Sequence, residues 1–213
     1  MKTLNKDHAS IIGGVLSESM RDKIFNLAMV GIDNGCQDWY QTGLSDVHAM
    51  AAVHGGTIED WAFLLSVYSP RVSVSRAARL SLMHFRNPDV RPSGSMAAVY
   101  RTAVKYRGRG FLNGKKTENF RRAILSGGFS DDLVLDIHMA NALEVEQSAL
   151  YRKWLYQPIE DLFYDVRSML NDVGIELTIA QLQASVWGGQ VLASGGNLDV
   201  RGLVPADVLK GEK

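Results

Sequence analysis

Residues 110–120 read GFLNGKKTENF and join two stretches that have helical spacing. The segment places Gly114 in a tight turn and puts Lys115 and Lys116 at the start of the second predicted helix. The first N–H groups of a helix lack partners within the helix and carry partial positive charge, so this end suits a phosphate. A glycine there would let the backbone approach the phosphate closely. The same pattern also fits an ordinary turn between two helices whose lysines are solvated.

Helical signals continue on both sides of this hairpin. A hydroxyl residue followed three positions later by an acid or amide marks helix starts at Ser19, Thr57 and Thr178. Few stretches alternate with a period of two, so strands are expected to be minor. Because a proline disfavours helical continuation, a break is expected at Pro158. The predicted helices cover residues 19–31, 39–54, 61–68, 73–85, 95–106, 117–125, 136–143, 150–156, 159–173 and 178–193.

These helices predict an all-α, bilobal helical fold formed by the whole chain of 213 residues. We expect its core at about 19–193 and the helix-hairpin-helix at about 95–126. The tail at 194–213 is expected to be loose. Glycines 188 and 189 fall inside the last predicted helix, where each costs about 1 kcal/mol relative to alanine, so another helix or DNA is expected to approach closely there.

Composition excludes several classes of protein. Cys36 is the only cysteine, which rules out a disulfide framework and a four-cysteine zinc or iron–sulfur site. No apolar run approaches the roughly 20 residues that cross a bilayer, and the first residues lack the apolar core of a signal peptide. We therefore expect a cytoplasmic protein with no membrane partner. No metal and no cofactor are expected.

Charge is balanced overall, with 23 basic and 23 acidic side chains, and this argues mildly against a nucleic-acid partner. The distribution is uneven, however. Between Arg101 and Arg122 the only acid is Glu118, and a local basic stripe can still bind a polyanion. A solvated helix face explains the stripe equally well. Its members are Arg101, Lys105, Arg107, Arg109, Lys115, Lys116, Arg121 and Arg122.

A second segment, residues 133–140, reads LVLDIHMA. Three apolar residues lead to Asp136, which is placed to cap a helix, and His138 follows in its first turn. A carboxylate held near a lysine shifts the protonation of both groups, and a lysine that loses its proton becomes a nucleophile for Schiff-base chemistry. Helix capping alone is the commonest use of an aspartate in this position. His84, by contrast, is expected to be a surface or loop residue.

Three segments together resemble one protein family. Residues 114–119, GKKTEN, are similar to the end of the G-V-G-x-K-T-A-N hairpin of endonuclease III-like DNA glycosylases, which belong to the helix-hairpin-helix (HhH-GPD) superfamily. Residues 135–139, LDIHM, resemble that family's V-D-V-H-M segment at nearly the same spacing from the lysine. Residues 64–74, LLSVYSPRVSV, are similar to its L-L-S-x-Q-x-T-D-x-S-V stretch. The three occur in the family's order and, with the final helices, span about 57–193.

The resemblance implies a catalytic set. Lys116 matches the lysine that attacks the sugar C1′ in bifunctional members, although Lys115 beside it leaves the nucleophile ambiguous. Asp136 matches the aspartate that assists the nucleophile and stabilises the cationic sugar. His138 matches a histidine near the catalytic centre in several members.

The resemblance also implies a double-stranded DNA partner. Gly114 and its neighbours Asn113, Lys115 and Thr117 would hold a DNA phosphate. Tyr68 occupies the place of a glutamine that fills the gap left by the flipped base, and an aromatic ring there could wedge into the base stack. Arg71, which follows this position, is expected to contact DNA.

Departures from the family pattern leave three functions open. Leu112 replaces the first hairpin glycine, Pro70 and Arg71 replace the Thr-Asp pair, and the carboxy-terminal cluster cysteines are absent. The first function is an N-glycosylase, with or without lyase activity, that removes a modified or damaged base as in DNA repair. The second resembles bacteriophage DNA hypermodification, in which an amino acid or amine replaces the phosphate groups of an activated 5-hydroxymethyluracil. The third is a DNA-binding relative without catalysis.

Overall fold

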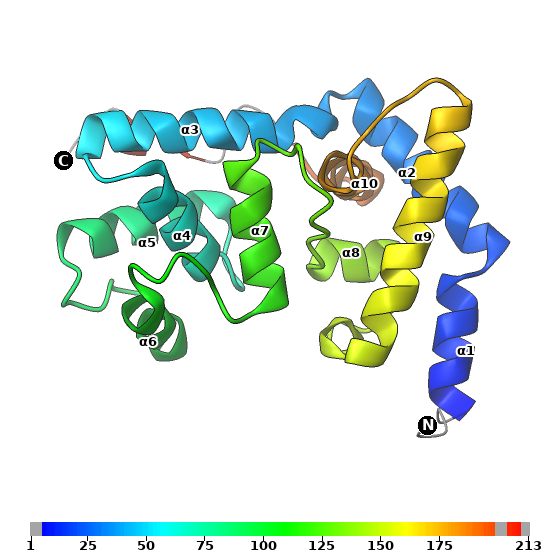
Figure 1. Ribbon diagram of the computed structural model, residues 1–213, viewed down its shortest axis with the longest axis horizontal. Helices are drawn as coiled ribbons and strands as arrows, with labels where there is room; N and C mark the ends of the chain where they lie inside the picture. The colour runs from blue at the N-terminus through cyan, green and yellow to red at the C-terminus, as the bar shows by residue number, and fades with distance from the viewer. Residues whose placement is uncertain (1–5, 199–203, 210–213) are drawn as a thin grey trace. The chain divides into compact units, whose positions relative to one another are not determined.

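A computed structural model describes residues 6–198 and 204–209. These residues form α-helices and short 3-10 turns with no strand assigned among them, which confirms the expected all-α class. Contacts divide the chain into two compact units (Figure 1). The first unit comprises residues 1–38 and 129–200, and the second comprises residues 39–128 and 201–213. Within the described ranges, no helix is long and apolar enough to span a bilayer.

The first unit packs α2 (Glu18–Asp33) tightly against α10 (Ile179–Ala193). A Cβ added to Gly31 would overlap the carbonyl oxygen of Ser185, and one added to Gly189 would overlap that of Leu27. Gly189 in α10 therefore permits the close approach of α2. The sequence left open whether another helix or DNA would approach these glycines, and here it is a helix. The remaining elements of this unit are α1 (Lys6–Val15), η1 (Cys36–Asp38), α8 (Ile137–Ala142), η2 (Ala149–Tyr151) and α9 (Lys153–Asp172).

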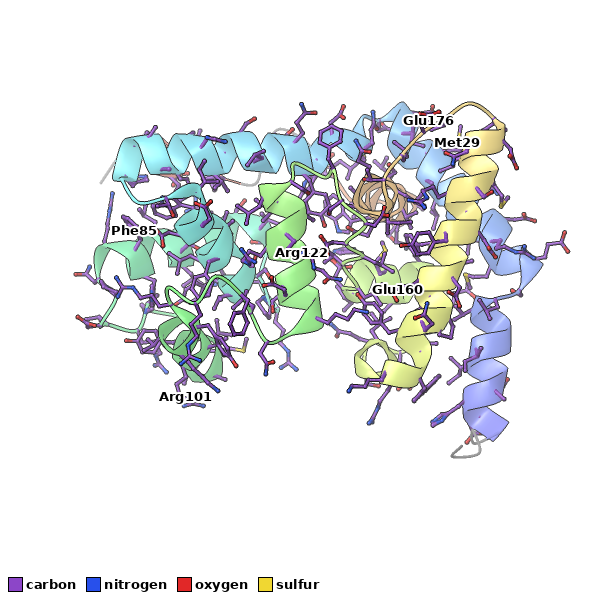
Figure 2. All side chains as sticks on the ribbon, in the orientation of Figure 1. Met29, Phe85, Arg101, Arg122, Glu160 and Glu176 are labelled. Atoms are coloured by element: carbon purple, nitrogen blue, oxygen red, sulfur yellow. The ribbon has the colours of Figure 1, made fainter. Side chains whose placement is uncertain are left out.

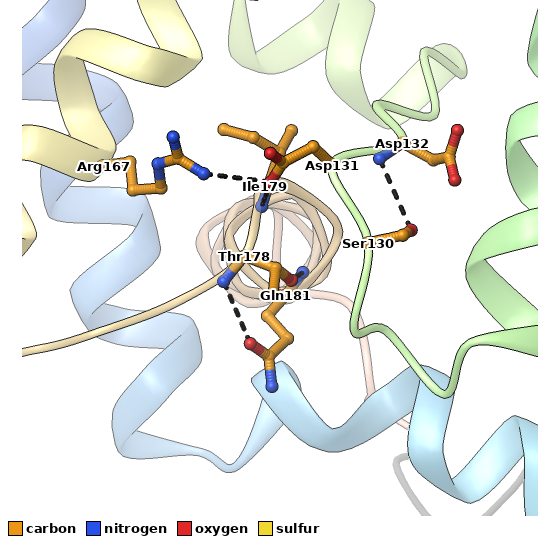
Figure 3. A network of polar contacts seen from close by, with 7 residues as sticks. All are labelled: Ser130, Asp131, Asp132, Arg167, Thr178, Ile179 and Gln181. Atoms are coloured by element: carbon orange, nitrogen blue, oxygen red, sulfur yellow. Dashed lines mark hydrogen bonds and ion pairs between the residues drawn. The ribbon is translucent and has the colours of Figure 1, made fainter.

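Asp131 fixes the extended segment that leads to α8. Its Oδ1 accepts a hydrogen bond from Arg167 Nη1 on α9 at 2.9 Å and another from the backbone N–H of Ile179 on α10 at 3.2 Å (Figure 3). The start of α10 is also closed by a capping box between Thr178 and Gln181, as predicted. One carboxylate thus ties the segment before α8 to two helices of the same unit.

The helix boundaries predicted around Pro158 are wrong, because one helix, α9, covers this segment. We expected two helices separated near Pro158, but α9 continues through Pro158 as one helix. The proline removes one backbone hydrogen bond. Burial of Leu155 before it and of Ile159 and Phe163 after it, on one apolar face, offsets that loss.

The second unit contains α3 (Trp39–His54), α4 (Ile58–Tyr68), α5 (Val74–Arg86), α6 (Ala97–Tyr106), α7 (Lys115–Leu125) and α11 (Ala206–Leu209). Thr57 and Asp60 form the predicted capping box of α4. From Trp61 to Tyr68 every residue of α4 is buried, so this helix forms the centre of the unit.

The tail is not loose at residues 204–209. The Nε2 atom of His54 lies 2.8 Å from the carbonyl oxygen of Val208, and the N–H of Val204 donates to Asp46 Oδ2 at 3.0 Å. These polar contacts, together with burial of Val204 and Val208, fix this segment against α3. The expectation is corrected for these residues, while residues 199–203 and 210–213 lie outside the described part of the chain.

Candidate nucleic-acid interface

The hairpin between α6 and α7 is anchored by Leu112. Its side chain is 5% exposed and packs in the core of the second unit, while its backbone N–H donates to Glu118 Oε2 at 2.7 Å. Gly108 and Gly110 adopt φ values of 70° and 71°, which a side-chain-bearing residue rarely adopts. Leu112 is therefore an apolar anchor at the position where the glycosylase pattern has its first hairpin glycine.

Glu118 is held on its other side by Arg121. The Nη2 atom of Arg121 donates to Glu118 Oε1 at 2.7 Å, and its Nε donates to Oε2 at 3.0 Å. Burial alone would raise the pKa of Glu118, but hydrogen bonds from Arg121 and from the N–H of Leu112 outweigh it, so the pKa lies below its usual value. Glu118, the one acid within the basic stripe, therefore acts as a brace for the hairpin: its carboxylate joins the backbone of Leu112 to the side chain of Arg121 on α7.

Helix α7 begins after Gly114, and no side chain caps it. Thr117 Oγ1 donates back to the Gly114 carbonyl at 3.0 Å. Lys115 is exposed, and Lys116 is half-buried in the first turn. The start of α7 therefore carries two lysine side chains. Its first backbone N–H groups receive no hydrogen bond from a side chain of the N-cap residue.

A groove of about 670 Å³ runs beside this helix end. Asn113, Gly114 and Thr117 line it from the hairpin, and the exposed Arg101 and Lys105 line it from α6. Arg101 is labelled on α6 in Figure 2. Most of the predicted phosphate-binding residues thus share one groove with two cations that lie one helical turn apart.

Aromatic rings lie next to one of these cations, Lys105. Lys105 Nζ lies 5.1 Å from the ring centroid of Tyr106, and Phe111 packs edge-on against that ring at 5.8 Å. Phe111 is 49% exposed. Sequence reasoning did not single out Phe111, although an aromatic residue in a glycine-bounded loop beside basic residues was the available signal.

Tyr68 does not fit the wedge role. Its ring is 1% exposed in the core of the second unit, and its hydroxyl lies 3.0 Å from Nδ1 of His84. The surface position expected for His84 is also corrected, since His84 is 2% exposed. The error arose because the residue before the α4–α5 turn still belongs to the buried α4. Arg71 does lie in that turn, exposed, with a φ of 61°.

Asp136 and His138 belong to the first unit, whereas Lys116 belongs to the second. Asp136 is the N-cap of α8, and its Oδ1 accepts from the N–H of Met139 at 3.0 Å. His138 packs edge-on against Trp187 of α10, with ring centroids 5.8 Å apart. The structure therefore groups the predicted hairpin residues in one unit and the predicted carboxylate and histidine in the other. Among the residues described, no three His, Cys, Asp or Glu side chains form a group that could hold a metal ion.

Comparison with known proteins assigns a family. Residues 16–192 match the model of DUF7178, a family of unknown function, and the chain belongs to that family. No curated protein and no solved structure matches the chain.

Proposed function

We propose that this protein acts on bases of double-stranded DNA and that its chemistry is that of an N-glycosylase of the helix-hairpin-helix type, with or without lyase activity. The observation that carries the proposal is the groove at the start of α7, where Asn113, Gly114 and Thr117 share one surface with Arg101 and Lys105. A helix end without a side-chain cap, flanked by exposed cations, is suited to a phosphate of the DNA backbone. Arg71 and Lys115 extend the proposed DNA contacts.

The proposed reaction uses Lys116 as the nucleophile on an extruded nucleotide. Its deprotonated amine bonds to the sugar C1′, the N-glycosidic bond breaks, and the departing base keeps the electron pair and gains a proton. Opening of the sugar ring then leaves a Schiff base between Lys116 and C1′. In the glycosylases that these motifs resemble, the aspartate matched by Asp136 assists the nucleophile and stabilises the cationic sugar, and the histidine matched by His138 lies near the catalytic centre. In this chain both residues belong to the first unit. If Lys116 only positions the DNA, water replaces it as nucleophile and the reaction ends at base removal.

Borohydride trapping tests this proposal. Duplex oligonucleotides carrying uracil, 8-oxoguanine, 5-hydroxymethyluracil or an abasic site are incubated with the protein and reductant, and covalent complexes are resolved on a denaturing gel. We expect a trapped complex with one of these duplexes and its loss in Lys116→Ala. Lys115→Ala is the matched control, because it removes a neighbouring exposed amine and should still be trapped. Absence of both a trapped complex and released base would refute the glycosylase proposal.

A second candidate is a DNA-base transferase of the bacteriophage hypermodification type. Two features favour it: the Leu112 N–H is committed to Glu118, and Tyr68 is buried rather than placed as a wedge. Both are departures from the repair-type pattern. In this reaction an amine forms a C–N bond at the 5-methylene carbon, the C–O bond breaks, pyrophosphate leaves and the amine proton passes to a base. Product formation from pyrophosphorylated 5-hydroxymethyluracil DNA and a supplied amine, without activity on damaged bases, would select this candidate. DNA binding with no reaction on any substrate would select a non-catalytic module.

A further inference from the structure

The loop that joins α6 to α7 carries a phenylalanine, Phe111, whose side chain is 49% exposed (Figure 1). A single exposed apolar residue is common on protein surfaces and carries no argument by itself. Phe111 differs because the backbone on both sides of it is held in place. Gly110 before it has a φ of 71°, and Leu112 after it is buried, with its N–H bonded to Glu118 Oε2 at 2.7 Å.

The glycines at 108 and 110 are required by the backbone conformation of this loop and not by packing. Both have positive φ values, and a Cβ added to either would meet nothing within 4 Å apart from its chain neighbours. Residues 107–111 therefore form a loop of defined conformation beside open space. A ligand can approach this backbone closely.

Two cations and Phe111 surround one ring, that of Tyr106 at the end of α6. Lys105 Nζ lies 5.1 Å from the centroid of this ring, and Arg109 Cζ lies 5.6 Å from it. The Phe111 centroid lies 5.8 Å away in an edge-on contact, so Tyr106 leaves at least one face of Phe111 uncovered. Because Tyr106 is only 9% exposed, solvent meets mainly the two cations and the Phe111 ring here.

The cations near Phe111 are not neutralised by the protein. Arg101, Lys105 and Arg109 are exposed, and none of them forms an ion pair with an acid of the described residues. Arg101, Lys105 and Tyr106 also line the groove beside the start of α7, so Phe111 packs against a residue of the groove wall. Proteins hold single-stranded nucleic acid with this combination, in which cations follow the backbone and an aromatic ring stacks on a base.

We propose that Phe111 is the residue on which an unpaired base of bound DNA stacks, while Arg101, Lys105 and Arg109 hold neighbouring phosphates. Stacking on a phenylalanine ring tolerates any base, because every base has a flat π-face. Tyr68 cannot take this role, since it is buried. The inference rests on the DNA-binding part of the proposed function and on none of its chemistry. It predicts tighter binding to DNA with an unpaired base than to fully paired DNA.

Fluorescence anisotropy with two duplexes of equal length tests this preference. One duplex is fully paired and the other carries a single bulged base, and both are measured at one salt concentration because phosphate contacts depend on salt. We expect the bulged duplex to bind roughly tenfold more tightly, as one stacked base contributes. Equal affinities would overturn the inference and leave phosphate binding at the groove intact. Failure of both duplexes to bind would overturn the inference and the DNA partner together.

Two substitutions of Phe111 form a matched pair. Phe111→Leu keeps an apolar side chain without an aromatic face and should bind the two duplexes within roughly twofold of each other, whereas Phe111→Trp should retain the preference. Phe129→Ala is the control, because Phe129 is 66% exposed in the first unit and is followed by Asp131 and Asp132 instead of basic residues. A preference that survives in Phe111→Leu, or that is lost equally in Phe129→Ala, would overturn the inference.

NMR spectra of the protein with labelled phenylalanine rings test the stacking without any substitution. A base stacked on Phe111 changes the resonances of its ring through the ring current of the base, and the resonances of Phe129 should stay in place. Binding of the bulged duplex without a change at Phe111 would overturn the inference.

An acidic protein segment is the other polyanion that a basic and aromatic surface can bind. Polyglutamate and single-stranded DNA are therefore compared as competitors of the bulged duplex at equal charge concentration, and we expect the DNA to compete more strongly. Stronger or equal competition by polyglutamate would overturn the inference in favour of an acidic peptide. A bulge preference that depends on Phe111, together with failed borohydride trapping, would retain the inference and refute only the glycosylase.

Discussion

Helices α7 and α8 both begin within segments that resemble glycosylase motifs, but their N-termini are completed differently. At α8 the carboxylate of Asp136 accepts the N–H of Met139, three residues along. At α7 the N-cap is Gly114, which has no side chain to offer. Asp136 therefore has a structural role as a helix cap, whereas Gly114 leaves the first turn of α7 without a side-chain cap.

The difference indicates what each helix end contributes to the proposed function. The α7 end, with the groove beside it, suits an anion that comes from outside the protein. The α8 end is stabilised from within, so any chemical role of Asp136 is added to its structural role. Experiments must therefore separate capping from catalysis at Asp136 and phosphate binding from nucleophilic attack at Lys115 and Lys116.

The largest effect is expected at Lys116. Lys116→Ala should slow adduct formation by roughly a thousandfold or more, because removal of a nucleophile leaves only binding and electrostatic assistance. Lys115→Ala should stay within roughly tenfold of the unsubstituted protein, since it loses a charge near the phosphate and no reacting atom. Single-turnover rates on the trapped substrate measure both. Equal rates for the two variants would assign neither lysine as the nucleophile.

Asp136 is tested by two substitutions of different chemistry. Asparagine caps a helix as well as aspartate, so Asp136→Asn should retain the free energy of unfolding while the reaction slows by roughly 10²–10⁴-fold. Asp136→Ala should lose the same rate and in addition about 1 kcal/mol of stability. Denaturant unfolding and single-turnover rates separate the two losses. An unchanged reaction rate in Asp136→Asn would show that Asp136 caps α8 and takes no part in the reaction.

Glu118→Gln tests the brace of the α7 hairpin. Losing a carboxylate that accepts from Arg121 and the Leu112 N–H should cost about 2 kcal/mol in the free energy of unfolding. The pKa of Glu118 is lowered in the folded protein, so its stabilisation is fully present above its unfolded pKa of about 4.3 and is lost as the pH falls through the folded value. The free energies of unfolding of the unsubstituted protein and of Glu118→Gln should therefore converge as the pH falls from 7 to 3. A difference in free energy of unfolding that stays constant over this pH range would contradict the stabilising role of Glu118.

The smallest effect is expected for the cations of the groove. Arg101→Ala and Lys105→Ala should each reduce the slope of log binding constant against log salt concentration by about 0.9, because each removes one phosphate contact. Fluorescence anisotropy with an undamaged duplex measures this slope. Arg152, an exposed arginine of the first unit, provides the control, and Arg152→Ala should leave the slope unchanged. Equal slopes for all four proteins would remove the groove from the DNA interface.

Local signals predicted most of the helices because their starts are determined by neighbouring residues. The capping boxes at Thr57 and Thr178 formed as expected, and α3 spans the predicted 39–54. Pro158 misled the prediction because the buried apolar face of α9 outweighs one missing hydrogen bond. Helix α1 was not predicted at all.

The candidate site was less predictable, because it depends on contacts between residues distant in the sequence. Tyr68 was placed on the surface, yet α4 is buried from Trp61 onward and carries no polar face to reveal which side meets solvent. The pairing of Tyr68 with His84 arises from the packing of α4 against α5, which no local pattern encodes. The hairpin residues, by contrast, are adjacent in sequence and were found together.

The most direct test of the central claim is to locate the covalent attachment. The borohydride-trapped complex is digested with protease and nuclease, and the peptide carrying the sugar remnant is sequenced by mass spectrometry. The account predicts that the remnant lies on Lys116. A remnant on Lys115, on another lysine or on the amino terminus, or the absence of any modified peptide, would contradict it.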